Sequence, residues 1–152
     1  MTIETTPKAQ VFSLRTPYLS AGHSTTQVAK GEHSWFAVKV YAQGGENALH
    51  AHPNEEHTFL VLEGQATFYN KDHTPTVVNR YEGVLLPKGT FYYFQSTGED
   101  QLVMLRAGSG KRSSPGEANR ITPNGQPFPA SDPNNKEGSM PGVPILGKFF
   151  ND

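Results

Sequence analysis

The sequence predicts an all-β protein, and two observations carry that prediction. Short segments rich in β-branched and aromatic residues recur along the centre of the chain, and clusters of Gly, Pro, Asn and Asp separate them. No stretch repeats its apolar residues at a helical period over three turns. Strands this short, at such regular spacing, are typical of a β-sandwich or a β-barrel.

Seven strands are expected, and each ends at a turn signal. The first is rich in aromatic and β-branched residues, which suit the pleated surface of a sheet. The third follows a turn at Glu63-Gly64 and alternates apolar with polar side chains. Turns such as Asn70-Lys71-Asp72 and Pro87-Lys88-Gly89 separate the remaining strands. The expected strands cover residues 35–42, 57–63, 65–70, 76–79, 83–86, 90–95 and 101–106.

The chain is expected to form one domain with an irregular arm at each end, because 152 residues suit a single domain. We predict an N-terminal arm over residues 1–34, a barrel over 35–110 and a C-terminal arm over 111–152. The last segment holds seven of the twelve prolines, and proline cannot donate to a strand ladder, so no sheet is expected there. Its apolar end, Val143 to Phe150, should dock on the barrel or on a second subunit.

Composition excludes several functional classes. The net charge of −1 disfavours a nucleic-acid or anionic-membrane partner, since both usually need a basic surplus. No apolar run is long enough to span a membrane, and the first residues lack the features of a secretion signal, so a cytoplasmic protein is expected. The absence of cysteine excludes disulfides, thiolate metal sites and cysteine nucleophiles.

Three of the six histidines, His50, His52 and His57, fall within eight residues. In an extended strand the side chains of His50 and His52 point the same way, so their nitrogens can converge on one ion. His57 shares a strand face with Phe59 rather than with Glu56. A set of imidazoles suits Fe, Ni, Cu or Zn better than Mg or Ca. The competing interpretation is a wet loop of solvated imidazoles, and the other three histidines are expected at the surface.

The segment from Gly44 to Gly64 resembles the first signature of the cupin superfamily, which is Gly, five residues, His-x-His, three or four residues, Glu, six residues, Gly. Here five residues separate Gly44 from His50-Ala51-His52, as in the signature, and six residues separate His57 from Gly64. His57 therefore stands at the family's Glu position. A shift of one residue would place Glu56 there instead, but strand phase and the spacing to Gly64 favour His57.

The second cupin signature is also recognisable, in shortened form. Gly83 leads to Pro87-Lys88-Gly89, and Tyr92 stands where the family has its last His. The resemblance covers residues 35–107 and implies a double-stranded antiparallel jelly-roll barrel holding one metal, in a family where many members dimerise. It implies metal ligands at His50, His52 and His57. Tyr92 is either a fourth ligand or proton donor beside the metal, or an ordinary core aromatic.

Several other polar residues in the expected strands could reach a ligand. Lys39, Tyr41 and Arg106 sit among apolar neighbours, and an outward orientation is expected because a buried charge is costly. If one of them faces inward, it would anchor a substrate carboxylate. Glu55 and Glu56 are expected at the exposed rim, with a role in orienting an imidazole as the alternative.

The resemblance implies a metal-dependent cupin acting on a small organic molecule, and an Fe-dependent oxygenase is the predicted class. One divalent transition metal per chain is expected, with Fe preferred over Zn, Ni, Mn or Cu, in a homodimer. A lumen near Phe59, Tyr92 and Phe94 would favour an aromatic or enolic substrate. The alternatives are a Zn- or Ni-dependent isomerase, cyclase or lyase, and a non-catalytic module that only binds a small ligand.

Overall fold

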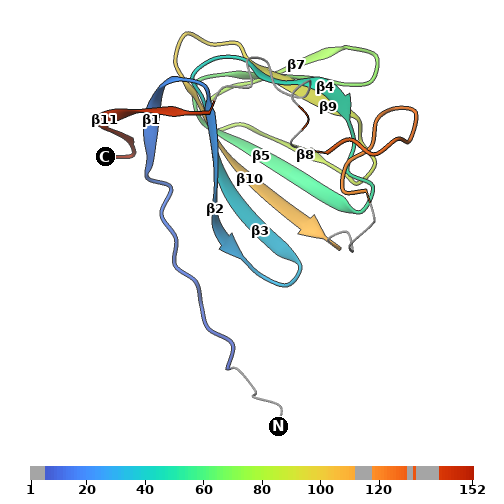
Figure 1. Ribbon diagram of the computed structural model, residues 1–152, viewed down its shortest axis with the longest axis horizontal. Helices are drawn as coiled ribbons and strands as arrows, with labels where there is room; N and C mark the ends of the chain where they lie inside the picture. Colours follow the sequence, from blue (N-terminus) through green and yellow to red (C-terminus); the bar gives the residue numbers. More distant parts are fainter. Residues whose placement is uncertain (1–5, 112–117, 130–131, 133–140) are drawn as a thin grey trace.

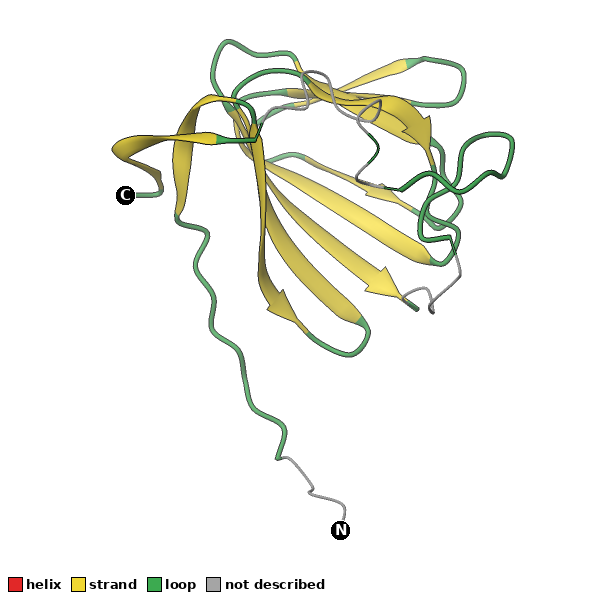
Figure 2. Ribbon diagram, in the orientation of Figure 1, coloured by secondary structure: helices red, strands yellow, loops and turns green. Residues whose placement is uncertain are grey.

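The computed structural model describes residues 6–111, 118–129, 132 and 141–152. Every regular element within them is a β-strand, as Figure 2 shows, and they contain no helix long and apolar enough to cross a membrane. The strands are β1 (Thr16–Ala21), β2 (His23–Lys30), β3 (Ser34–Tyr41), β4 (Gly45–His50), β5 (Glu55–Glu63), β6 (Ala66–Tyr69), β7 (Pro75–Val78), β8 (Gly83–Leu86), β9 (Tyr92–Ser96), β10 (Leu102–Gly110) and β11 (Val143–Phe150).

Two antiparallel sheets face each other and form the body of the molecule (Figure 1). The larger sheet has the strand order β2-β3-β10-β5-β8, and the smaller has the order β4-β9-β6-β7. Neighbours in these sheets are mostly distant in sequence, as in a jelly roll. Among the described residues, hydrogen bonds do not close the two sheets into a continuous barrel. The all-β jelly-roll prediction is confirmed.

The core between the sheets follows from the two-residue period of the strands. On β5 the side chains of Glu55, His57, Phe59 and Val61 are buried, while Glu56 is exposed. Aromatic side chains from both sheets interlock around Phe59. The buried cluster comprises Tyr41, Phe59, Val61, Ala66, Phe68, Val78, Tyr92, Phe94, Leu102 and Met104.

A third, two-stranded sheet made of β1 and β11 packs on part of the outer face of the larger sheet. Leu19 from β1 is buried against Val38, Val40 and Val103, and Phe150 from β11 packs on the same cluster. Apolar residues near the two ends of the chain therefore find a partner surface on the larger sheet, as expected for the C-terminal segment.

The irregular arms predicted from the sequence contain strands. Within residues 1–34, β1 and β2 form, and β2 pairs with β3 as an edge strand of the larger sheet. The prediction that no sheet forms in residues 111–152 is wrong for β11, although Pro144 lies in it. A two-stranded sheet has free edges, so a proline can direct its missing donor away from the partner strand.

Truncation of the chain after Gly142 should lower the free energy of unfolding by about 1–3 kcal/mol, because it removes the partner of β1 and the cover that Phe150 provides. Chemical denaturation measures the effect. Leu146→Ser is the matched control, since that side chain is 99% exposed and its loss should change little. Unchanged stability of the truncated protein would contradict the packing described for β11.

Candidate metal centre

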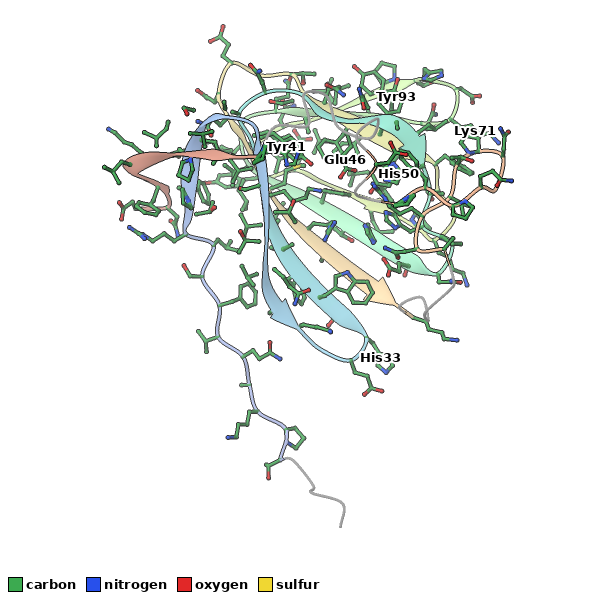
Figure 3. The ribbon with its side chains drawn as sticks, viewed as in Figure 1. His33, Tyr41, Glu46, His50, Lys71 and Tyr93 are labelled. Atoms are coloured by element: carbon green, nitrogen blue, oxygen red, sulfur yellow. The ribbon has the colours of Figure 1, made fainter. Side chains whose placement is uncertain are left out.

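The three clustered histidines lie between the two sheets, at the end of β4 and the start of β5. His50 is the last residue of β4, His52 lies two residues later, and His57 is the third residue of β5. All three are buried, with exposed fractions of 0%, 7% and 3%. Figure 3 shows His50 beside Glu46 on β4, whereas His33 lies far away at the surface turn between β2 and β3.

The rings of these histidines form one cluster with the phenol of Tyr92. The His52 and His57 rings stack with their centroids 3.9 Å apart, and the His50 ring lies 5.4 Å from that of His52. The Tyr92 ring lies 4.5 Å from that of His50, and its hydroxyl is 3.4 Å from Nε2 of His52. The fold thus brings together all four residues predicted to surround a metal, while their coordination stays a prediction.

Glu55 joins this cluster, although it was expected at the exposed rim. It begins β5 on the buried face, and its Oε2 accepts a hydrogen bond from Nε2–H of His57 at 2.8 Å. The same oxygen lies 3.8 Å from Nδ1 of His52. The rim position expected for Glu56 is confirmed, since Glu56 is exposed.

The donor atoms of His52, Glu55 and His57 fit a metal ion. One ligand atom from each of these residues lies within 4.8 Å of the others. Among the described residues, the buried Nδ1 of His57 has no hydrogen-bond partner, so this ring is only partly committed to contacts with them. Two imidazoles and a carboxylate suit a divalent transition metal and leave further coordination positions for water, substrate or dioxygen.

His50 is committed to protein partners at both ring nitrogens. Its Nδ1–H donates to the carbonyl oxygen of Ala48 at 2.8 Å, and its Nε2 accepts a hydrogen bond from the guanidinium of Arg120 at 2.6 Å. Arg120 also contacts Oε2 of Glu46 at 3.2 Å, and Lys39 reaches Oε1 of Glu46 at 3.0 Å. The buried charged groups of Lys39, Glu46 and Arg120 therefore contact one another in turn, and Arg120 donates to the lone pair on Nε2 of His50.

The buried environment fixes the protonation states of these groups. Burial alone would raise the pKa of Glu46, but Lys39 and Arg120 outweigh it and hold that pKa well below its usual range. Burial and the charge of Arg120 lower the pKa of His50 to about 4. Burial also lowers the pKa of His52 and of His57, so all three imidazoles are neutral near pH 7, as metal ligands must be. Burial raises the pKa of Tyr92, which keeps its phenol protonated.

The predicted pocket residues turn inward more often than expected. Lys39 and Tyr41 are almost fully buried, so the expected outward orientation is wrong for both. Lys39 can face inward because Glu46 neutralises it. Arg106 lies on the same face of β10 as the core residue Met104, and its buried Nε has no hydrogen-bond partner in the part of the chain that the structure describes. The hydroxyl of Tyr41 likewise has no hydrogen-bond partner among these described residues.

Phe59 and Phe94 pack in the same buried cluster as Tyr92, and their role as pocket residues stays a prediction. The Phe59 ring lies 5.8 Å from that of Tyr92 and 5.6 Å from that of Phe94. Two important residues of the site were not predicted, Glu46 and Arg120. Glu46 carries a signal, because it shares a strand phase with His50 four residues later. Arg120 lies 70 residues from its partner His50, and no local pattern marks it.

Comparison with known proteins locates the region of similarity. Residues 37–107 match the sequence family described as the cupin domain. Over 59 residues the chain is 36% identical to the uncharacterized protein YdbB of Bacillus subtilis, a match that covers 39% of this chain. It covers 52% of that relative, so the chain spans about half the length of the curated relative it matches.

Solved structures share the fold at low sequence identity. A conserved protein with a double-stranded β-helix domain from Klebsiella pneumoniae superposes with a TM-score of 0.62 and 16% identity, over 75% of this chain and 95% of its own. Oxalate oxidase in complex with the substrate analogue glycolate gives a TM-score of 0.50 and 17% identity, over 60% of this chain and 52% of its own. Identities this low establish the fold alone.

Glu46→Gln should lower the free energy of unfolding by about 3–5 kcal/mol, because Lys39 and Arg120 would keep their buried charges without the anion between them. Urea denaturation of metal-free protein measures the difference. The exposed Glu56 supplies the control, and Glu56→Gln should change stability by less than about 0.5 kcal/mol. Equal stability of the two variants would show that the buried ion pairs contribute little.

The same comparison has an expected pH dependence. Since folding lowers the pKa of Glu46, its contribution is fully present above the ordinary value of 4.5 and is lost as the pH falls through the folded pKa. Wild type and Glu46→Gln should both lose stability below about pH 6.5, where histidines of the unfolded chain take up protons that buried His50 refuses. A difference between them that shrinks already at pH 6 would contradict the assignment to Glu46.

Proposed function

Since this chain belongs to the cupin superfamily, we propose that it is a mononuclear metal-dependent enzyme that acts on a small organic molecule, as an Fe-dependent oxygenase. The observation that carries the proposal is the buried group of His52, Glu55 and His57, which gathers two neutral imidazoles and a carboxylate in one place. Two His ligands and one carboxylate are a donor set used by non-haem Fe(II) oxygenases.

The metal would be held by His52, Glu55 and His57. Iron bound there would supply redox chemistry with dioxygen at coordination positions that the protein leaves open. The set predicted from the sequence, with His50 as the third ligand, is the alternative. It requires Arg120 to leave Nε2 of His50, a contact of 2.6 Å. The carboxylate set requires only that the proton of neutral His57 move from Nε2, where it is donated to Glu55, to Nδ1.

Tyr92 would act as the proton donor beside the metal. Its hydroxyl lies 3.4 Å from Nε2 of His52, and its raised pKa keeps the proton in place at neutral pH. The rings of Phe59 and Phe94 exclude water and offer flat apolar surfaces, which favour an aromatic or enolic substrate.

An anionic group on the substrate would bind at the inner face of the larger sheet. Nε of Arg106 and the hydroxyl of Tyr41 are buried donors without an acceptor among residues 6–111, 118–129, 132 and 141–152. A buried donor without a partner costs free energy that an incoming carboxylate or enolate oxygen would recover. Lys39 would contribute charge rather than a direct contact, because Glu46 already holds its ammonium group.

A non-redox reaction at the same site is the second candidate. Two imidazoles and a carboxylate also bind zinc, and a protonated phenol beside a Lewis acid suits isomerase, cyclase or lyase chemistry. The choice depends on which metal the protein takes up. The homodimer expected from the sequence is likewise proposed, supported by exposed apolar side chains at Val11 and Phe12 near the N-terminus and at Leu85 on the edge strand β8.

Metal content should separate the two ligand sets. His52→Ala, His57→Ala and Glu55→Ala should each lose most of the bound metal, whereas His50→Ala should keep about one ion per chain. Elemental analysis after dialysis measures the content, with Glu56→Ala as the exposed carboxylate control. Loss of metal in His50→Ala with retention in Glu55→Ala would establish the histidine set instead.

Oxygen uptake should identify the reaction class. Protein purified without chelators and reconstituted with Fe(II) should consume dioxygen with one or more members of a panel of phenols and diketones. Tyr92→Phe should keep its iron but lose activity by about 10²–10⁴-fold, the range for loss of a general acid. A protein that takes up zinc alone and consumes no dioxygen would contradict the oxygenase and favour the second candidate.

A further inference from the structure

Residues 118–128, here called the capping segment, lie against the end of β4. Successive residues of the segment contact successive residues of the His50–His52 stretch. The carbonyl oxygen of Asn119 accepts a hydrogen bond from His52 at 3.2 Å, and the backbones of Ile121 and Ala51 exchange two hydrogen bonds of 3.0 Å. Figure 1 shows this segment, in orange, beside the end of β4 and the start of β5.

The capping segment is folded so that the side chain of Arg120 points into the site. Ile121 pairs with Pro127, and the amide of Phe128 donates to the carbonyl oxygen of Arg120 at 2.9 Å. The Phe128 ring is buried, 6.4 Å from the ring of His50, and the Arg120 guanidinium lies 5.8 Å from its centroid. Arg120 itself is 5% exposed. Its position is therefore set by the packing around it.

Arg120 is hydrogen-bonded to the nitrogen atom, Nε2, through which His50 would bind a metal. A neutral imidazole has one lone pair, and in His50 the proton lies on Nδ1, where it is donated to the carbonyl oxygen of Ala48. The lone pair on Nε2 accepts the hydrogen bond from Arg120. A guanidinium cannot lose its proton to become an acceptor, so the two cations, metal and guanidinium, compete for one nitrogen.

Glu46 makes this arrangement stable. Its carboxylate holds the same terminal nitrogen of Arg120 that donates to His50, at 3.2 Å. Its other oxygen is held by Lys39, so Glu46 is fixed from both sides. Without an anion at this position, a buried arginine would be costly to keep beside a metal site.

We propose that Arg120 is a positioning residue that keeps His50 out of the coordination shell of the metal. The wild-type site then holds its ion with the imidazoles of His52 and His57 and the carboxylate of Glu55, and His50 coordinates only when Arg120 is removed. This inference rests on the proposed metal site. It assigns to a residue of the C-terminal segment, outside residues 37–107, the choice of metal ligands in the cupin domain.

Counting the imidazoles bound to Cu²⁺ tests the inference without any activity assay. Pulsed electron paramagnetic resonance of the Cu²⁺-loaded full chain should report two coordinated imidazoles in the wild type. Arg120→Met fills a similar volume but cannot donate to His50, and it should show three. Its affinity for Cu²⁺ should rise by about 10–100-fold, the usual range for a change next to the ligands. Arg120→Ala is the second variant should methionine not be accommodated.

Arg106→Met is the matched control, since it removes a guanidinium from the same interior without touching the bond to His50. Its copper should keep two coordinated imidazoles. This result would distinguish the effect of losing the hydrogen bond to His50 from the effect of losing a positive charge. Adding His50→Ala to Arg120→Met should return the count to two. Three imidazoles in the wild type, or two in both Arg120 variants, would overturn the role of Arg120. A wild type that binds no copper would refute the metal site itself.

Discussion

The buried carboxylate of Glu46 is the interaction on which the site depends. It comes from β4 in the smaller sheet, binds Lys39 from β3 in the larger sheet, and binds Arg120 from the capping segment. One anion thus links the two sheets and a segment that is distant in sequence. Because the exposed fractions of all three side chains are 5% or less, none of these charges can turn to water if a partner is lost.

The ion pairs of Glu46 separate the polar groups of the site into two sets, one around His50 and one around His52 and His57. Arg120 takes the lone pair of His50, while His52 and His57 stack beside the carboxylate of Glu55. Burial keeps the imidazoles neutral and the phenol of Tyr92 protonated. Metal binding needs neutral imidazoles, and subsequent acid catalysis needs a group that still holds its proton.

The sequence was sufficient wherever the determining interactions are local. The two-residue period of a strand predicts that His57 faces inward and Glu56 outward, and the structure confirms both positions. The sequence was insufficient where a partner far away in the chain determines the orientation of a side chain or the formation of a strand. Lys39 faces inward because Glu46 lies opposite, and β11 forms despite Pro144 because β1 offers it an edge. Arg120 approaches His50 across 70 residues of chain, which no spacing rule anticipates.

The most direct test of the account is a crystal structure of protein purified without chelators, with diffraction measured on both sides of the absorption edge of the bound metal. The account predicts one anomalous peak in contact with His52, Glu55 and His57, with Arg120 still hydrogen-bonded to Nε2 of His50. A peak in contact with Nε2 of His50, with Arg120 displaced, would contradict it.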